Sequence, residues 1–548
     1  MNRKEAGRFT NPSGKGSGSD NKRQRFRHLA PGVIGVCLVM IVASSLALVL
    51  VPGARASPTP LGSTTVKVPC GASIQAAINA AHSGETILLA PCTYVQQLTI
   101  DKSVNIVGAG TGKTIIQSPA VLTTDVYGNS WTIELGNAAA VSVSGVTVLV
   151  TLQCLVVNPL TGLPYASGGI GVGGSASLNL ESAVVTTTGL AEGATCTGGV
   201  STYGTGVDFG LDYVVGTPSA SALLGYGEVS QVTVSGFGFG GAGVEVGGLA
   251  DAPAGSYALI SQSTIFLSAN ANPGLAAVCV GCGGSANTAT IDHDIVDGQA
   301  ATYADAVAST GGSSVAVTRS TILGSTGGCG VCASFSGLAT VEYSTVLAGV
   351  GGAGLFGGYG GSLVALHDLI LGNTSASIPF GLLSVGVYLV FAQSATVSDN
   401  TIGQFECEYS PTYVSDGLCG PDWATQFQAA AIDNIAGSPG PFIETNNLIY
   451  SSDVGVFSWD GCSQCTVTGN VVVDPVDYGL DGIDGSYSFG PDVIIGGMYG
   501  VASIAYTAST TVSLSHVVMI GQSVGSFYYE NDCLTLWGYS CTDTIVGT

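Results

Sequence analysis

Five residues able to move protons or bind anions occupy one position of a recurring sequence pattern. The pattern runs apolar, two variable residues, small polar, one variable, apolar, as in 291–296 and 317–322. Its third position holds the candidate column: His293, Arg319, Tyr343, His367 and Asp399. Imidazole, phenol and carboxyl groups serve as general acids and bases. We predict that Arg319 neutralises a carboxylate or acts as base, while His293 or His367 transfers protons.

The same position also holds residues that support a purely structural interpretation. In the other units these are Gln231, Gln262, Thr445, Gly469 and His516. An outward-facing position of a β-strand is polar for solubility alone. The alternative is therefore that the five residues form a solvated row without catalytic function.

The repeat itself predicts the elements that carry this column. From Val229 to Met519 the pattern returns at steps of roughly 25–30 residues, and one longer step predicts a degenerate unit near Val493. Short β-branched segments and Gly-rich turns at this period are typical of a β-solenoid. We predict an all-β, single-stranded right-handed parallel β-helix whose coils lie about 4.8 Å apart. The fourth position predicts a row of polar turn residues: Ser263, Asp294, Ser320, Ser344, Asp368, Asn400, Asn446 and Asn470.

The start of the repeat region predicts an amphipathic helix. Ile74, Ala77, Ile78 and Ala81 fall on one helical face, and Ser73 is a suitable N-cap. A strand is predicted next, over Thr86–Ala90. A helix at this point would cover the apolar core and the unpaired strand edge of the solenoid.

This region resembles a known superfamily. The stretch from Ile74-Gln-Ala-Ala-Ile through Gly84-Glu-Thr-Ile-Leu-Leu-Ala-Pro to Leu98-Thr-Ile-Asp-Lys-Ser-Val-Asn-Ile-Val-Gly-Ala-Gly is similar to the N-terminal cap of pectin-lyase-like proteins. The later units resemble their parallel β-helix repeat, so the resemblance covers roughly residues 66–530. It implies the fold but no single activity, because the superfamily includes lyases, hydrolases, esterases and adhesins.

The catalytic motifs of the enzyme families are missing. Pectate and pectin lyases use several Asp residues for calcium and several basic residues, whereas Arg319 is the single Arg after Arg55. The Asp-Asp, His-Gly and Arg-x-Lys elements of polygalacturonases are absent, as are the Gln-Asp and Gly-Arg-Pro-Trp elements of pectin esterases. The resemblance therefore carries over no catalytic residue.

The N-terminal segment predicts export. A basic region over 1–32 precedes the apolar run Val33–Val51 and the small residues around Ala56. This predicts a signal peptide within 33–56, cleaved before Ser57. The run is also long enough to remain as a transmembrane anchor. Either alternative places the rest outside, secreted or on the extracellular face of the plasma membrane. We divide that rest into a cap with the first coils (66–118) and a β-helix (119–548) with a loop insertion at 403–442.

The charge pattern excludes one class of partner. The chain has 36 acidic and 13 basic residues, and after Arg55 the basic ones are Lys67, Lys102, Lys113 and Arg319. Nucleic-acid binding needs clustered basic residues, so it is excluded. An anionic polysaccharide would meet long-range repulsion unless cations bridge it. Membrane contact is expected through residues 33–51 alone, if they are retained.

Cysteines agree with export, because 14 of the 15 remain after Cys37 of the apolar run is set aside. Local disulfides are the simplest interpretation. The predicted pairs are Cys70/Cys92, Cys154/Cys196, Cys279/Cys282, Cys329/Cys332, Cys407/Cys419, Cys462/Cys465 and Cys533/Cys541. One zinc ion shared by Cys279/Cys282 and Cys329/Cys332 is rejected, because two coils separate these pairs by about 10 Å.

One acidic stretch could bind calcium. Asp474, Asp477, Asp481 and Asp484 offer carboxylate oxygens, although their spacing fits no known calcium loop, and a solvated turn is the alternative. No other cofactor is predicted.

Two functions follow from the sequence. The first is a non-catalytic surface β-helix for adhesion, glycan contact or envelope structure. The second is a polysaccharide lyase or glycoside hydrolase that acts on an extracellular polysaccharide at the candidate column. The scarcity of basic groups and the missing motifs favour the first.

Overall fold

The computed structural model describes residues 64–124, 129–152, 166–190, 203–210, 224–237, 242–247, 254–267, 276–282, 286–372, 384–406, 429–435, 441–459, 464–505, 508–531 and 543–547. The chain divides into two units, Met1–Leu61 and Gly62–Thr548. The predicted signal peptide or anchor lies outside the described residues. Within the described ranges, no helix has the length and hydropathy needed to cross a membrane.

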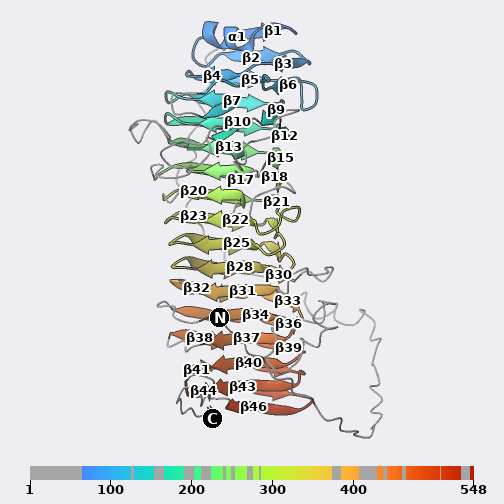
Figure 1. The fold of residues 1–548 in the computed structure, drawn as a ribbon, viewed down its shortest axis with the longest axis vertical. Coiled ribbons are helices and arrows are strands. Elements are labelled where there is room, and N and C mark those ends of the chain that lie inside the picture. The colour runs from blue at the N-terminus through green and yellow to red at the C-terminus, as the bar shows by residue number, and fades with distance from the viewer. Residues whose placement is uncertain are drawn as a thin grey trace, which may run out of the picture. The chain divides into compact units, whose positions relative to one another are not determined.

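The strands form three parallel sheets, A, B and C, and each coil adds one strand to each sheet (Figure 1). Sheet A contains β1 (Thr65–Val68), β2 (Thr86–Leu89), β5 (Val104–Val107), β8 (Ala140–Ser144), β11 (Ala176–Glu181), β14 (Gly225–Ser230), β17 (Tyr257–Ser261), β20 (Thr288–Asp292), β23 (Ser314–Thr318), β26 (Leu338–Glu342), β29 (Ser362–Leu366), β32 (Ser394–Ser398), β35 (Phe442–Thr445), β38 (Cys465–Thr468), β41 (Ser486–Phe489), β44 (Thr510–Leu514) and β47 (Asp543–Gly547). Sheet B contains β3 (Thr93–Val95), β6 (Ile115–Gln117), β9 (Thr147–Leu152), β12 (Val184–Leu190), β15 (Thr233–Phe237), β18 (Thr264–Leu267), β21 (Ile295–Asp297), β24 (Thr321–Leu323), β27 (Thr345–Leu347), β30 (Leu369–Leu371), β33 (Thr401–Phe405), β36 (Leu448–Ser452), β39 (Val471–Val473), β42 (Val493–Ile495) and β45 (Val518–Ile520). Sheet C contains β4 (Leu98–Ile100), β7 (Ser130–Leu135), β10 (Ala166–Val172), β13 (Tyr203–Phe209), β16 (Val244–Val246), β19 (Ala276–Val280), β22 (Asp305–Ser309), β25 (Cys329–Ser334), β28 (Ala353–Gly358), β31 (Val385–Val390), β34 (Ala430–Ile435), β37 (Val454–Trp459), β40 (Tyr478–Ile483), β43 (Tyr499–Ala505) and β46 (Gly525–Asn531).

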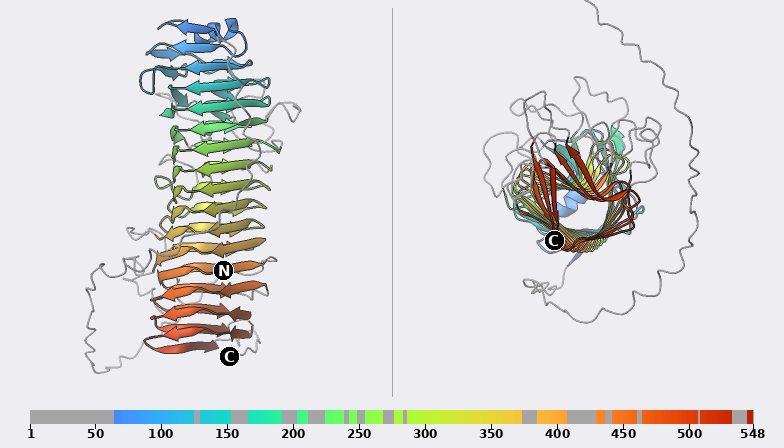
Figure 2. Two further views of the ribbon diagram at one scale, coloured as in Figure 1. Left: turned by 180° about the vertical axis from the view of Figure 1, so that it is seen from behind. Right: turned by 90° about the horizontal axis from the view of Figure 1, so that it is seen from below.

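Each strand pairs in parallel with the equivalent strand of the next coil. In sheet A, for example, Ile291 pairs with Val317 and Val317 pairs with Val341. Seen along the coil axis, the three sheets surround a common interior (Figure 2). Inward residues of all three sheets fill it, and these residues form one continuous apolar core. The right-handed parallel β-helix predicted from the repeat is confirmed.

A short helix, α1 (Ile74–Ala80), lies beside the first strands (Figure 1). The hydroxyl oxygen of Ser73 accepts a hydrogen bond from the Ala76 amide at 3.1 Å, which is N-cap geometry. Ile74 and Ile78 are buried and, with Ala81, join the core, while Ala77 packs against it. The helical face read from the sequence is therefore the face that packs on the first coils.

Turns of two residues connect sheet A to sheet B in every coil from β8 to β39. In all eleven of these turns the first residue has a positive φ, between 49° and 74°. The second residue is buried. From Ser263 onward the second residues form a hydrogen-bonded ladder in which one side chain accepts from the backbone N–H of the preceding coil. Its members are Ser263, Asp294, Ser320, Ser344, Asp368, Asn400, Asn447, Asn470 and Asp492.

The repeat alignment is wrong by one residue in one coil. The sequence assigns Thr445 and Asn446 to the third and fourth positions, but Asn446 has φ 59° and Asn447 belongs to the ladder. The reason is that Glu444 points into the core and is fully buried, while Ile443 is 39% exposed. The prediction placed the apolar residue Ile443 inside and the charged residue Glu444 outside.

Two further expectations concern the later coils. A coil is present near Val493, where β42 pairs with β39 and β45, as predicted. The loop expected over 403–442 is too wide, because β33 extends to Phe405 and β34 (Ala430–Ile435) lies inside the range. Asp433 and Asn434 interrupt the apolar alternation of β34, which hid this strand from the pattern.

Candidate functional site

The five residues of the candidate column lie on consecutive coils. Each directly follows a residue of sheet A, and those residues pair in register along the sheet, as Asp292 does with Thr318. The backbone N–H of His293 donates to Thr318 O at 3.2 Å, and the equivalent bond recurs at each later member. Successive members are therefore about 4.8 Å apart along the axis.

The backbone conformation of the column is unusual for its residue types. The φ angles lie between 49° and 61° at His293, Arg319, Tyr343, His367 and Asp399. Residues other than Gly, Asn and Asp adopt this conformation at a cost of about 1 kcal/mol or more. All five side chains point into solvent. The turn therefore displays large polar groups at positions where Gly or Asn would be less strained.

Asp292 is the centre of a charged cluster at one end of the column. Its Oδ1 atom accepts hydrogen bonds from Thr318 Oγ1 at 2.6 Å and from Arg319 Nη2 and Nε at 2.7 and 3.0 Å. Its Oδ2 atom lies 3.0 Å from His293 Nδ1. Partial burial alone would raise the pKa of Asp292, but the bonds from Thr318, Arg319 and His293 outweigh it and hold the pKa below its usual value. An ionised Asp292 favours a proton on His293 Nδ1, which leaves Nε2 as a base toward solvent.

The middle of the column holds a stacked pair. The rings of Tyr343 and His367 lie 5.0 Å apart with an interplanar angle of 14°. Tyr343 is 61% exposed. Asp399 ends the set and accepts a hydrogen bond from Ser398 Oγ at 2.7 Å. A base, a cation and three further proton-transfer groups therefore stand along one edge of sheet A.

The outer face of sheet A continues from the column toward the N-terminus. There it contains a groove of about 440 Å³, lined by Asn179, Tyr226, Glu228 and Tyr257 among others. At the edge of this part of the sheet, Gln231 Nε2 donates to Gln262 Oε1 at 3.2 Å. The groove on the face of sheet A and the column at its edge thus belong to the same sheet.

A second row of functional groups was missed by the sequence reasoning. On the outer face of sheet C, strand pairing aligns Asp208 with Glu245, and further along Phe356, Tyr388, Asp433, Phe457 and Asp481 in successive coils. Burial raises the pKa of Asp433 to about 7. Burial, followed by the charge of Asp433, raises the pKa of Tyr388 to about 12. The segments from sheet B to sheet C differ in length, so no constant spacing marks this row.

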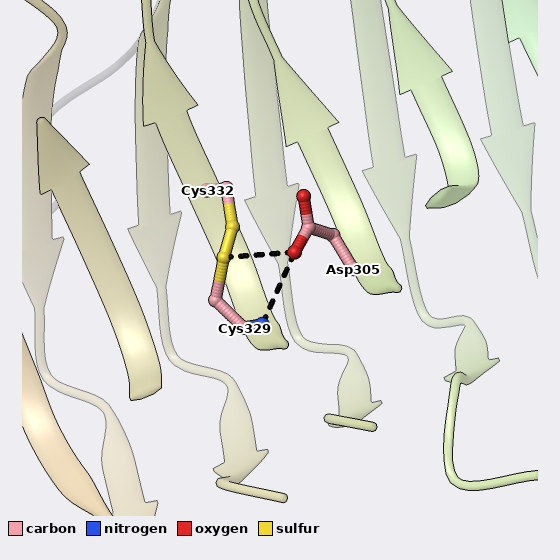
Figure 3. A group of neighbouring side chains, drawn as sticks. All are labelled: Asp305, Cys329 and Cys332. Carbon is pink, nitrogen blue, oxygen red and sulfur yellow. Dashed lines mark hydrogen bonds between the residues drawn. A yellow bond between two sulfur atoms is a disulfide. The ribbon is translucent and has the colours of Figure 1, made fainter. Parts of the chain in front are cut away.

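Sheet C also brings Asp305 beside the Cys329–Cys332 pair (Figure 3). Asp305 Oδ1 lies 3.2 Å from Cys329 Sγ and accepts the Cys329 N–H at 3.1 Å. These ligand atoms lie within 4.8 Å of one another. Two thiolates and a carboxylate would suit zinc. The two sulfurs are joined in a disulfide, however, so the residues do not fit a metal in this state.

The calcium candidates are spread along the chain. Asp477 is buried directly before β40, and Asp481 is buried within this strand. Asp484 follows β40, and Asp474 lies in the turn after β39 with φ 48°. Among the described residues, no three of these carboxylates lie within 4.8 Å of one another. Calcium binding stays a prediction.

The structure pairs Cys70 with Cys92, Cys279 with Cys282 and Cys329 with Cys332. Cys465 is disulfide-bonded. The other predicted pairs involve Cys154, Cys196, Cys407, Cys419, Cys462, Cys533 and Cys541, which lie outside the described residues. Cys279 aligns through Ala308 with Cys332, so these two pairs lie two coils apart on sheet C.

A match to a protein-family model supports the fold. Residues 305–489 match the family model described as "Right handed beta helix region". No curated protein sequence matches the chain. Among solved structures, the A-module of the mannuronan C-5 epimerase AlgE6 of Azotobacter vinelandii is 12% identical, with 87% of this chain and 94% of that chain covered and a TM-score of 0.38. The catalytic unit of a GH87 alpha-1,3-glucanase from Streptomyces thermodiastaticus is 14% identical (90% and 69% covered, TM-score 0.26), and the pectate lyase Pel9A is 13% identical (75% and 80% covered, TM-score 0.24).

The family match over residues 305–489 and the three parallel sheets identify the fold as a right-handed parallel β-helix, the fold that the sequence resemblance implied.

Proposed function

We propose that this right-handed parallel β-helix protein is an exported enzyme that cleaves an extracellular polysaccharide at the candidate column. The observation that carries the proposal is the Asp292 cluster, in which one ionised carboxylate contacts both His293 and Arg319. A base oriented by a carboxylate is the arrangement used for general base catalysis. Both side chains are about half exposed, so a polymer could reach them.

Elimination fits these groups better than hydrolysis. A glycosidase of the usual type needs one protonated carboxyl group as acid, whereas Asp292 is held ionised by its hydrogen bonds. In an elimination, His293 Nε2 would take the proton next to the carboxylate of a uronic acid, and Arg319 would stabilise the developing negative charge. The C4–O bond then breaks as the C4–C5 double bond forms. The leaving oxygen receives a proton from Tyr343, one coil beyond Arg319.

The charge of the protein gives this proposal a second consequence. The net charge of −23 repels a polyuronate at long range. Salt screens that repulsion, while the short contacts at Arg319 are less affected. We therefore expect kcat/KM on a polyuronate to rise as ionic strength increases from about 10 to 150 mM.

The test is a panel of soluble polysaccharides, assayed for unsaturated ends by ultraviolet absorbance and for new reducing ends. His293→Ala should lower the elimination rate by about 100-fold or more. His516→Ala is the matched control, because His516 occupies an equivalent exposed turn position, with φ 58°, away from the cluster. Reducing ends without unsaturation would indicate hydrolysis. Binding without any product would favour a non-catalytic glycan-binding protein, and equal rates for His293→Ala and wild type would refute the column as the active site.

A further inference from the structure

The opposite edge of sheet A carries an exposed aromatic stack. Phe335, Tyr359 and Phe391 occupy equivalent turn positions between sheets C and A on three consecutive coils. The ring centroids lie 5.7 Å apart for Phe335 and Tyr359, and 6.5 Å apart for Tyr359 and Phe391. The three residues are 65%, 56% and 50% exposed. Such rings in water mark a binding surface more often than a structural need.

The backbone conformation at these three positions is unfavourable for aromatic residues. All three aromatic residues have positive φ, between 49° and 51°. Bulky residues rarely adopt this conformation, which costs about 1–2 kcal/mol each, while Asn and Gly adopt it readily. Placing three rings in strained positions lowers stability, while half or more of the surface of each residue stays exposed to water. Strain that recurs in three neighbouring coils is typical of a functional surface.

Among the described residues, the turn next to the first ring of the stack has no side chain that could cover this ring. In the coil before Phe335 the equivalent turn residue is Gly311, followed by Gly312, with φ 61° and 77°. A Cβ added at Gly312 would have its nearest neighbour 4.0 Å away. This turn therefore carries no side chain over the ring of Phe335. On the outer face of sheet C, Phe356 packs against Tyr359, with 6.1 Å between the ring centroids.

We propose that a pyranose ring of a polysaccharide stacks on the free face of Phe335, above the Gly311–Gly312 turn, and that the three-ring stack is a second glycan site. The apolar C–H face of a sugar is a partner that suits the face of an exposed aromatic ring. Strand β26 begins three residues after Phe335 and ends before Tyr343, so the stack and the column flank the same strands. A five-residue strand spans about 17 Å, so one sugar cannot touch both. The stack would anchor a polymer that the column processes; its ligand class rests on the proposed function.

The test uses variants that should fold well. Phe335→Asn, alone and combined with Tyr359→Asn and Phe391→Asn, places a residue that tolerates positive φ at each site. Tyr303→Asn is the matched control, because Tyr303 has φ 58°, is 40% exposed and lies outside the stack. Retention in affinity electrophoresis would be measured in gels with polygalacturonate, alginate, xylan or laminarin. We expect Phe335→Asn to weaken retention by the best polymer about 3- to 10-fold, and the triple variant by more.

A second readout separates this site from the column. In a His293→Ala background retention should persist, whereas the triple Asn variant should keep its rate on short oligosaccharides and lose rate on the polymer. Wild-type retention by none of the polymers, or equal retention of the wild type and the triple variant, would overturn the second site. A change in sedimentation alone would do the same, since it would assign the stack to self-association.

Discussion

The turns between sheets A and B differ between the first and the later coils. In the earlier coils the buried second residue is Val146, Ala183 or Val232, and all three belong to the main apolar core. From Ser263 to Asp492 the same position is polar and hydrogen-bonded from coil to coil. The same backbone turn thus accepts either an apolar or a hydrogen-bonded polar residue at its second position.

The difference coincides with the chemistry on the outside. In the coils with an apolar second turn residue, the first turn residue is Gly145, Ser182 or Gln231. In the coils of the ladder, the first turn residues include the whole candidate column. A hydrogen-bonded support fixes the position of an exposed side chain better than apolar packing does, which suits a site that must hold several groups in register. We therefore interpret the ladder as the rigid base of the column.

The largest expected effect is the loss of one ladder residue. Asn400 accepts from Asp368 N at 2.8 Å, and its amide donates to Ala365 O and Asn447 Oδ1. Asn400→Val would leave these buried groups unpaired, so we expect a loss of about 3 kcal/mol in the free energy of unfolding. Val146→Ala should cost about 2 kcal/mol. Urea unfolding measures both, and a smaller cost for Asn400→Val would contradict the distinction.

The ladder should also make stability depend on pH. Burial raises the pKa of Asp294 and Asp368 to about 7, whereas in the unfolded chain these groups ionise near pH 4. Between these values the folded state binds more protons, so stability falls as the pH rises. The double variant Asp294→Asn and Asp368→Asn should show a flatter profile and gain about 1–3 kcal/mol at pH 8. An unchanged slope between pH 5 and 8 would show that the ladder does not carry the effect.

A smaller effect is expected where the two kinds of turn meet. Val232 is buried above Ser263, whose hydroxyl oxygen accepts the Val232 N–H at 3.1 Å. Val232→Ser removes apolar contacts that the neighbouring core needs, so we expect a cost of about 1–2 kcal/mol rather than an extended ladder. Thermal unfolding would detect it. A stabilised variant would mean that the apolar turns are replaceable.

The smallest effect on stability should come from the exposed cluster. Asp292 and Arg319 are 25% and 56% exposed. A double-mutant cycle with Asp292→Asn and Arg319→Gln should give a coupling of at most about 1 kcal/mol. The same variants should strongly reduce cleavage if the column is catalytic. A coupling of several kcal/mol would instead assign this pair to the structural support.

The sequence predicts the coils well where inward-facing strand residues are apolar and outward-facing ones are polar. Val317 and Ile322 lie inside and Arg319 outside because the turn between them always has the same length. The predicted register begins at Val229, so the turns at Val146 and Ala183 lie outside it, although their coils belong to the predicted β-helix over 119–548. Glu444 misled the alignment because a buried carboxyl group reads as an outward residue. Burial raises its pKa to about 7, and Asn434 donates to it at 2.6 Å.

The aromatic stack and the row on sheet C were beyond pattern reasoning for a different reason. Phe335, Tyr359 and Phe391 occupy one turn position, but the segments before them vary in length. Their proximity follows from strand pairing, which the three-dimensional register sets. Residues next to the constant A–B turn can be aligned from the sequence, and residues elsewhere cannot.

The constant two-residue turn has a consequence for how such a protein changes. From β8 to β39 this connection never varies, whereas the connection from sheet B to sheet C ranges from one residue between β36 and β37 to a long segment between β33 and β34. Insertions can therefore accumulate on one side of every coil while the spacing on the other side is conserved. The A–B turns therefore keep a fixed spacing along the axis, and new loops can be inserted between sheets B and C without changing that spacing.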